Sequence, residues 1–204
     1  AFSRVTDHWL LQSPSNEPTT HGLTELFEIQ PIITTIGQST LVGILIAGNQ
    51  NGLLVPHIIF DEELDFLNEM LALPIVSLES NLTALGNLIL VNDRAALVSP
   101  EFTATEIQAI HNTLGVEVEA RTLAGSNLVG SYCVVTNRGL LVHTDLSEEE
   151  RDWLASFFSV KVEEGTINCG VPYVSIGLLA SSEAAAAGFE TTGPELMRIT
   201  EAFF

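Results

Sequence analysis

The sequence contains almost no lysine and little positive charge of any kind. Lys161 is the only lysine, and seven basic residues stand against 26 acidic ones, which gives a formal net charge of −19. Such a chain repels phosphate backbones, so the charge argues against nucleic-acid binding through a basic patch. The near absence of lysine favours an acidic surface hydrated in a salt-rich cytoplasm, where screening weakens self-repulsion. An ordinary acidic protein at moderate salt is the alternative.

Long apolar runs, a basic leader and a cysteine framework are also missing. No stretch of about 18 uninterrupted apolar residues occurs, so the sequence predicts no transmembrane helix. The first residues lack the basic region typical of a secretory signal, and Cys133 and Cys169 are the only cysteines. We therefore expect a cytoplasmic protein with free thiols and no membrane contact. The histidines show no metal-ligand spacing, so we expect neither a metal nor a cofactor.

The sequence does contain an internal repeat. Gly43, Gly86 and Gly130 are separated by 43 and 44 residues, and the same period aligns Asn49 with Asn92. When the repeats are aligned, several positions carry similar residues in successive copies, and a random apolar sequence would not keep this spacing. We expect a single domain, 1–204, made of five repeats at about 1–30, 31–74, 75–117, 118–160 and 161–204.

Each repeat has the pattern of strands followed by an amphipathic helix. Apolar runs such as "STLVGILIAG" and "GLLV" predict two strands joined by a turn, and "VEVEART" predicts a strand before them. Segments such as "SEEERDWLASFF" place apolar residues at helical spacing. The glycine column indicates a bulge or a close backbone approach. Units of this kind hide their apolar faces by closing into a ring, so we predict a five-bladed α/β propeller with pseudo-fivefold symmetry.

Glutamates recur at the start of the predicted helices, at Glu63, Glu106, Glu150 and Glu195. A hydroxyl and a carboxylate three residues apart form a capping box, which satisfies free amides at a helix start. We interpret these glutamates as helix caps rather than general acids. Hydroxyl residues stand three positions before the last three of them: Thr103, Ser147 and Thr192.

The first repeat lacks its first strand, because the position equivalent to Gly43 falls just before Ala1. Either the sequence is a fragment, or the ring carries an unpaired edge at this point. We expect a fragment, since an open sheet edge favours aggregation.

Five phrases in order, on this shared period, resemble the translation initiation factor six family. They are "GNQNGLLVP", "ALGNLILVNDRAALVSPE", "LVGSYCVVTNRGLLVH", "EEGTINCGVPYVSIGLLA" and "TTGPEL". The resemblance covers about residue 31 to the C-terminus, extends more weakly through the first thirty residues, and points to the archaeal branch. It implies a pentein fold, in which five α/β units surround a pseudo-fivefold axis, and a ribosome anti-association factor. Such a factor binds the large ribosomal subunit and sterically blocks joining of the small subunit, without catalysis.

The resemblance also implies partners and contact residues. The partner is chiefly a basic ribosomal protein of the universal L14 type, with little direct rRNA contact, and we expect a monomer. The family's contact positions fall on Asn49, Gly86, Asn87 and Tyr132, which we expect on equivalent edges of neighbouring repeats. Three of these residues also have a structural interpretation: a turn former for Asn49, a bulge glycine for Gly86 and a packed strand aromatic for Tyr132.

A second hypothesis is a guanidine-modifying enzyme of the same ring architecture, such as a deiminase or an amidinotransferase. Cys169 in "NCGVP" would be its nucleophile and His143 its base, while Asp145 or Asp93 would bind the guanidinium group. A nucleophilic cysteine needs nearby positive charge, which this sequence scarcely has. "NCGVP" is typical of a turn, and His143 lies at the end of a predicted strand, so we prefer the first hypothesis.

Overall fold

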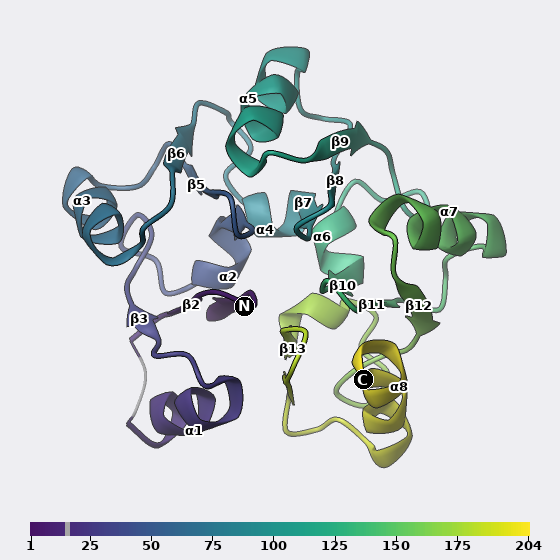
Figure 1. Cartoon of the computed structure of the whole chain (residues 1–204). Helices are drawn as coiled ribbons and strands as arrows, with labels where there is room; N and C mark the ends of the chain where they lie inside the picture. The colour runs from purple at the N-terminus through teal and green to yellow at the C-terminus, as the bar shows by residue number, and fades with distance from the viewer. Residues whose placement is uncertain (15–16) are drawn as a thin grey trace.

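Five antiparallel hairpins recur along the chain, and each belongs to a small sheet of its own (Figure 1). The structure, a computed structural model, describes residues 1–14 and 17–204. In four sheets, a third strand pairs in parallel with the second strand of the hairpin. In chain order, the sheets contain β1 (Ser3–Val5), β2 (Leu10–Gln12) and β3 (Ile32–Ile33); β4 (Ala47–Gly48), β5 (Leu53–Pro56) and β6 (Ile75–Leu78); β7 (Ile89–Val91), β8 (Ala95–Val98) and β9 (Glu117–Ala120); β10 (Cys133–Val135), β11 (Gly139–Val142) and β12 (Lys161–Glu164); and β13 (Leu178–Ala180) and β14 (Ala185–Ala187).

The third strand reaches its sheet through a helical crossover, as parallel pairing requires. β6, for example, begins after helix α3 (Asp61–Met70) and pairs with β5, so that Leu54 lies opposite Val76. The strand predicted to open each repeat therefore completes the sheet of the preceding hairpin. Among the described residues β14 has no such partner.

Five longer helices lie on the outside of the molecule, one after each hairpin (Figure 1). Capping boxes start three of them at Thr103, Ser147 and Thr192, and each hydroxyl residue donates its backbone N–H to the predicted glutamate. The capping interpretation is thus confirmed. At α3, Glu63 similarly accepts a bond from the Phe60 N–H. The other outer helices are α1 (Glu17–Phe27), α5 (Ala104–Leu114), α7 (Glu148–Phe158) and α8 (Gly193–Phe203).

Single helical turns surround the centre of the molecule, where the sequence analysis predicts continuous strands. The prediction of uninterrupted extended runs is wrong, because only two or three residues at the end of each run are extended. The repeating glycines lie within these turns and mark close backbone approach rather than bulges. A Cβ atom at Gly86 would lie 2.2 Å from the carbonyl oxygen of Gly43. The inner turns are α2 (Val42–Leu45), α4 (Leu85–Leu88), α6 (Val129–Tyr132) and the 3₁₀ turn η1 (Val174–Ile176).

The described part of the chain is thus a mixed α/β structure with five small sheets and eight α-helices. Its buried apolar residues form five clusters. One cluster joins the two ends of the chain, because Val5, Leu10 and Phe27 pack with Ala184 of the last hairpin. None of the helices within 1–14 and 17–204 has both the length and the apolar character needed to cross a bilayer.

Candidate functional site

The candidate site is the surface around the inner turns, which we call the inner-helix face. It consists of α2, α4, α6, η1 and the residue before each of them. Consecutive turns contact one another, and the glycines allow this, since a Cβ atom at Gly130 would meet the carbonyl oxygen of Gly86 at 2.3 Å. Gly86 is buried and contributes close packing rather than a side chain. The backbone of the face is therefore held by direct contact between neighbouring units.

Asn87 is half-buried on α4. Its backbone N–H donates to the carbonyl oxygen of Ala84 at 2.9 Å. Within the described residues its side-chain amide makes no hydrogen bond, whereas buried amides are normally paired. Asn87 therefore offers an amide donor and acceptor that the fold does not use.

Tyr132, at the end of α6, belongs to a small aromatic cluster. Its ring packs edge-on against Tyr173 at 5.2 Å and against His143 at 5.8 Å between centroids. Partial burial, together with Tyr173 and the charge of Asp145, raises the pKa of Tyr132, although a hydrogen bond with Ser126 acts in the opposite direction. The phenol therefore stays neutral at physiological pH and presents a rigid aromatic edge with a hydroxyl.

An apolar column that the sequence analysis does not single out borders these residues. Leu41, Leu128 and Tyr173 precede three of the inner turns, and their exposed fractions lie between 38% and 39%. Ile176 on η1 is 46% exposed. Exposed apolar side chains gathered on one face are typical of a protein-binding surface. The 43-residue register could have revealed this column, because Leu41, Ala84, Leu128 and Tyr173 occupy one position of the repeat.

Asn49 lies away from the other three predicted contact residues. It follows β4 in a hairpin turn, whereas Gly86, Asn87 and Tyr132 lie on inner turns at the opposite end of the short strands. Asn49 therefore occupies a different place in its repeat from the other three, although Asn49 and Asn87 both line a central cavity.

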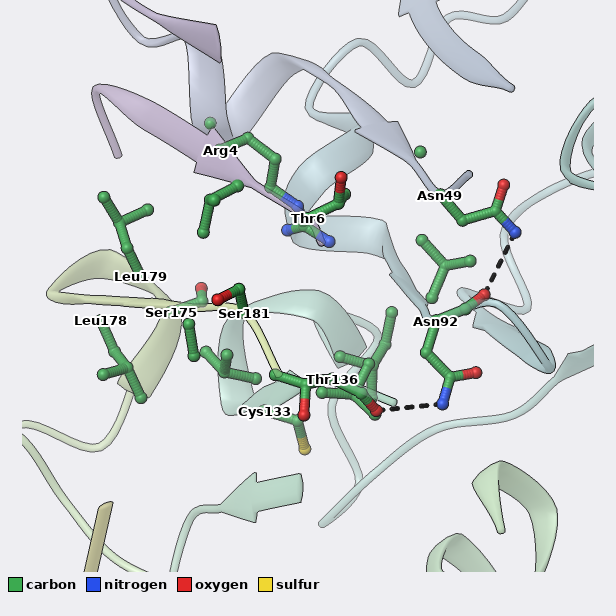
Figure 2. A pocket seen from close by; sticks show the side chains of 18 of the residues that line it. Arg4, Thr6, Asn49, Asn92, Cys133, Thr136, Ser175, Leu178, Leu179 and Ser181 are labelled. Carbon is green, nitrogen blue, oxygen red and sulfur yellow. Dashed lines mark hydrogen bonds between the residues drawn. The ribbon is translucent and has the colours of Figure 1, made fainter. Parts of the chain in front are cut away.

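Asn49 is 1% exposed, and it joins two units. Its Nδ2 donates to the carbonyl oxygens of Asn92 at 3.1 Å and Leu114 at 3.0 Å, and its Oδ1 accepts from the Asn51 N–H at 2.9 Å. Asn92 repeats this bond, since its Nδ2 donates to the Thr136 carbonyl oxygen at 3.1 Å (Figure 2). Every polar group of the Asn49 side chain is therefore used within the fold.

The residues of the enzyme hypothesis are not assembled into a catalytic site. Cys169 is exposed in a turn with φ of 62°, as its sequence indicates, and its N–H donates to the carboxylate of Glu195 at 3.2 Å. His143 is buried beneath Tyr132, with its Nδ1 3.4 Å from Asp145. Among the described residues, no hydrogen bond or ion pair connects Cys169 with His143. Asp93 accepts a bond from the Gln50 N–H at 2.9 Å in a hairpin turn.

No group of three or more histidine, cysteine, aspartate or glutamate side chains in the described part of the chain is placed to hold a metal ion. Cys133 is buried, and this burial, followed by the charge of Glu150, raises the pKa of its thiol. It therefore stays protonated and acts as a small apolar side chain in the core.

Comparison with known proteins identifies the family of this chain. The eIF-6 family profile matches residues 1–202. A protein of Pyrococcus horikoshii named translation initiation factor 6 is 41% identical over 98% of this chain and 91% of its own length. Proteins of the same name from Thermococcus onnurineus (43% identical; 95% of this chain, 87% of the relative) and Methanosarcina mazei (41% identical; 98% and 91%) are also similar. The chain belongs to the eIF-6 family, a family of translation initiation factors and not of enzymes.

Proposed function

We propose that this protein is a ribosome anti-association factor that binds the large ribosomal subunit through the inner-helix face. It then blocks the small subunit by occupying the space that this subunit needs. One observation carries the proposal. The side-chain amide of Asn87, the ring of Tyr132 and several exposed apolar side chains lie on the same face of the molecule. Family membership gives the translation role, and no covalent step or cofactor is required.

The proposal includes a closed five-bladed propeller of the pentein type, formed as one domain from five repeats at about 1–30, 31–74, 75–117, 118–160 and 161–204. Five sheets of the same hairpin topology support it. So do the contacts between β1 and β13, which connect the first hairpin with the last. A ring of this kind resists deformation, and rigidity is what steric obstruction needs.

The partner that fits this chain is a basic ribosomal protein on the large subunit, of the universal L14 type. A net charge of −19 favours capture by a basic protein surface and disfavours rRNA. The protein acts as a monomer in the cytoplasm, where ribosomes assemble.

Two roles follow for the four contact positions. Asn87 and Tyr132 touch the partner directly, because their side chains reach the inner-helix face. Gly86 and Asn49 act indirectly: Gly86 allows α4 to lie against α2, and Asn49 fixes neighbouring hairpins to one another. Tyrosine is among the residues enriched at interface hot spots, and Tyr132 is partly exposed beside the apolar column.

Co-sedimentation with purified large subunits tests the proposal. Tyr132→Ala and Asn87→Asp each remove a direct contact, and we expect each to weaken binding by about 10-fold, the equivalent of roughly 1.4 kcal/mol. Asn112→Asp and Phe66→Ala are matched controls on the outer helices α5 and α3. Undiminished binding by both face variants, or equal losses in the controls, would contradict the assignment of the face.

A further inference from the structure

A cavity of about 60 Å³ lies at the centre of the molecule, and its lining includes Asn87, Ile44 and Ile176 of the inner-helix face. Its walls come from the inner strands β1, β4, β7, β10 and β13, one from each sheet (Figure 2). A cavity needs roughly 10–15 Å³ by this measure to hold one water molecule. The space therefore holds several waters, or one small ion with part of its hydration shell.

Arg4 on β1 extends its side chain toward the middle of this cavity (Figure 2). Burial lowers the pKa of its guanidinium to about 10, so the group remains charged at neutral pH. No salt bridge or side-chain hydrogen bond to Arg4 occurs anywhere in 1–14 or 17–204, although a guanidinium carries five N–H donors.

The acidic groups that border the cavity are already engaged with neighbouring turns. The Asp7 carboxylate accepts bonds from the Ser182 N–H at 2.6 Å and from Asn137 Nδ2 at 2.9 Å. Asp93 accepts from the Gln50 N–H at 2.9 Å and from Asn137 Nδ2 at 2.5 Å. These bonds hold both carboxylates in the hairpin turns, and neither pairs with the Arg4 guanidinium.

The hydroxyl groups near Arg4 are engaged in a similar way. Thr6 Oγ1 accepts from the N–H groups of His8 and Trp9, both at 3.2 Å. Ser181 Oγ accepts from the Glu183 N–H at 3.2 Å. Much of the remaining wall is apolar, and a buried cation whose neighbouring carboxylates are bonded elsewhere is unfavourable.

We propose that the central cavity binds one small inorganic anion, a chloride or a tetrahedral oxyanion, on the guanidinium of Arg4. The five N–H donors match such a ligand, and charge-assisted bonds of this type are short and strong. A volume of about 60 Å³ suits a small inorganic ion. The anion acts as a structural ion, since it neutralises a cation at the point where all five sheets meet. The proposal does not rest on the ribosomal role proposed above, although the cavity shares Asn87 with the inner-helix face.

Thermal unfolding in sodium chloride, sodium phosphate and sodium gluconate, at matched ionic strength, tests the proposal. Gluconate is a bulkier anion than chloride or phosphate and controls for general screening. For the wild type we expect a Tm higher by about 2–4 °C in chloride or phosphate than in gluconate, the shift that corresponds to roughly 1 kcal/mol in a chain of this size. Arg4→Gln should abolish this difference. Arg198→Gln, which removes an exposed arginine paired with Glu163 and Glu201, should retain it.

An anion effect that persists in Arg4→Gln, or is absent from the wild type in both small anions, overturns the proposal. A second measurement does not depend on the variant folding. Wild-type crystals soaked in sodium bromide should show an anomalous peak beside the Arg4 guanidinium. Crystals that show bromide only at surface sites would also overturn the proposal.

Discussion

Asp7 and Ser182 join the first hairpin of the chain to the last. The Asp7 carboxylate accepts a bond from the Ser182 N–H at 2.6 Å and from its hydroxyl group at 2.7 Å. The two residues are 175 positions apart, yet they occupy equivalent places in their hairpin turns. This contact brings together the two chain ends that an open arrangement would leave apart.

Replacing Asp7 with asparagine tests the importance of this contact. Asp7→Asn keeps the size of the side chain but removes its charge and one acceptor oxygen, so we expect a loss of about 1–3 kcal/mol in the free energy of unfolding. Urea denaturation measures the loss. Asp65→Asn, at an exposed position of α3, serves as the control and should change little. Equal urea midpoints for Asp7→Asn and the wild type would show that the bonds between Asp7 and Ser182 do not contribute to the stability of the fold.

A second prediction concerns the packing of the inner turns. In Gly86→Ala the new methyl group would lie 2.2 Å from the Gly43 carbonyl oxygen and 2.8 Å from that of Ile46. Backbone atoms cannot move aside cheaply, so we expect a destabilisation of about 1–3 kcal/mol. Gly22→Ala on α1, where nothing lies within 4 Å of the new atom, should instead stabilise by about 0.5–1 kcal/mol. The Tm should therefore fall in Gly86→Ala and rise in Gly22→Ala. An unchanged Tm in Gly86→Ala would contradict the close packing of α4 against the backbone of Gly43.

The third prediction concerns acid stability. Burial alone would raise the pKa of Glu195, but bonds from the N–H groups of Thr192 and Gly170 and the hydroxyl of Thr166 outweigh it and lower the pKa from 4.5 to about 2. A carboxyl whose pKa is lowered in the folded state stabilises the fold above its unfolded pKa. This contribution is lost as the pH falls from about 4.5 towards 2.

Glu195→Gln should therefore reduce the free energy of unfolding by on the order of 2–3 kcal/mol at pH 7. The difference from the wild type should shrink as the pH falls from about 4.5 towards 2, because the carboxyl of the unfolded chain takes up a proton over this range before the native carboxyl does. Denaturation at a series of pH values measures the difference in the free energy of unfolding. Glu190→Gln, at an exposed position, is the control. A difference that does not depend on pH would rule out the carboxylate as its source.

Much of the fold follows from the repeat and from helix signals in the sequence. The predicted helix "SEEERDWLASFF" corresponds to α7 (Glu148–Phe158), and Glu150 caps it as expected. Its carboxylate also accepts a bond from the Ala124 N–H at 2.8 Å in a distant loop. That second role is not predictable, because capping is local whereas the loop lies 26 residues away.

The inner turns could not be predicted, for a different reason. "LVGIL" is a short apolar run, and periodicity cannot distinguish a buried strand from a single buried helical turn. The repeat likewise aligns the first strand of each unit without revealing which hairpin it joins. At the candidate site, Asn87 and Tyr132 could be predicted only through the family resemblance. The unpaired guanidinium of Arg4 could not be predicted, because only the three-dimensional structure shows which groups surround it.

The fourth prediction concerns salt. If the acidic surface is adapted to a salt-rich cytoplasm, repulsion among 26 carboxylates destabilises the fold at low ionic strength. The Tm should then rise from dilute buffer to molar KCl, in the wild type and in Arg4→Gln alike, since general screening does not require the cavity. A lower Tm at molar KCl would contradict this adaptation.

The most direct test of the proposed function is a subunit-joining measurement in matching salt. Purified large and small ribosomal subunits are mixed with the protein, and the joined ribosomes are separated on a sucrose gradient. We expect the wild type to move with the large subunit and to lower the joined fraction, while a variant carrying both Asn87→Asp and Tyr132→Ala does neither. An unchanged joined fraction at saturating wild-type protein would contradict the account.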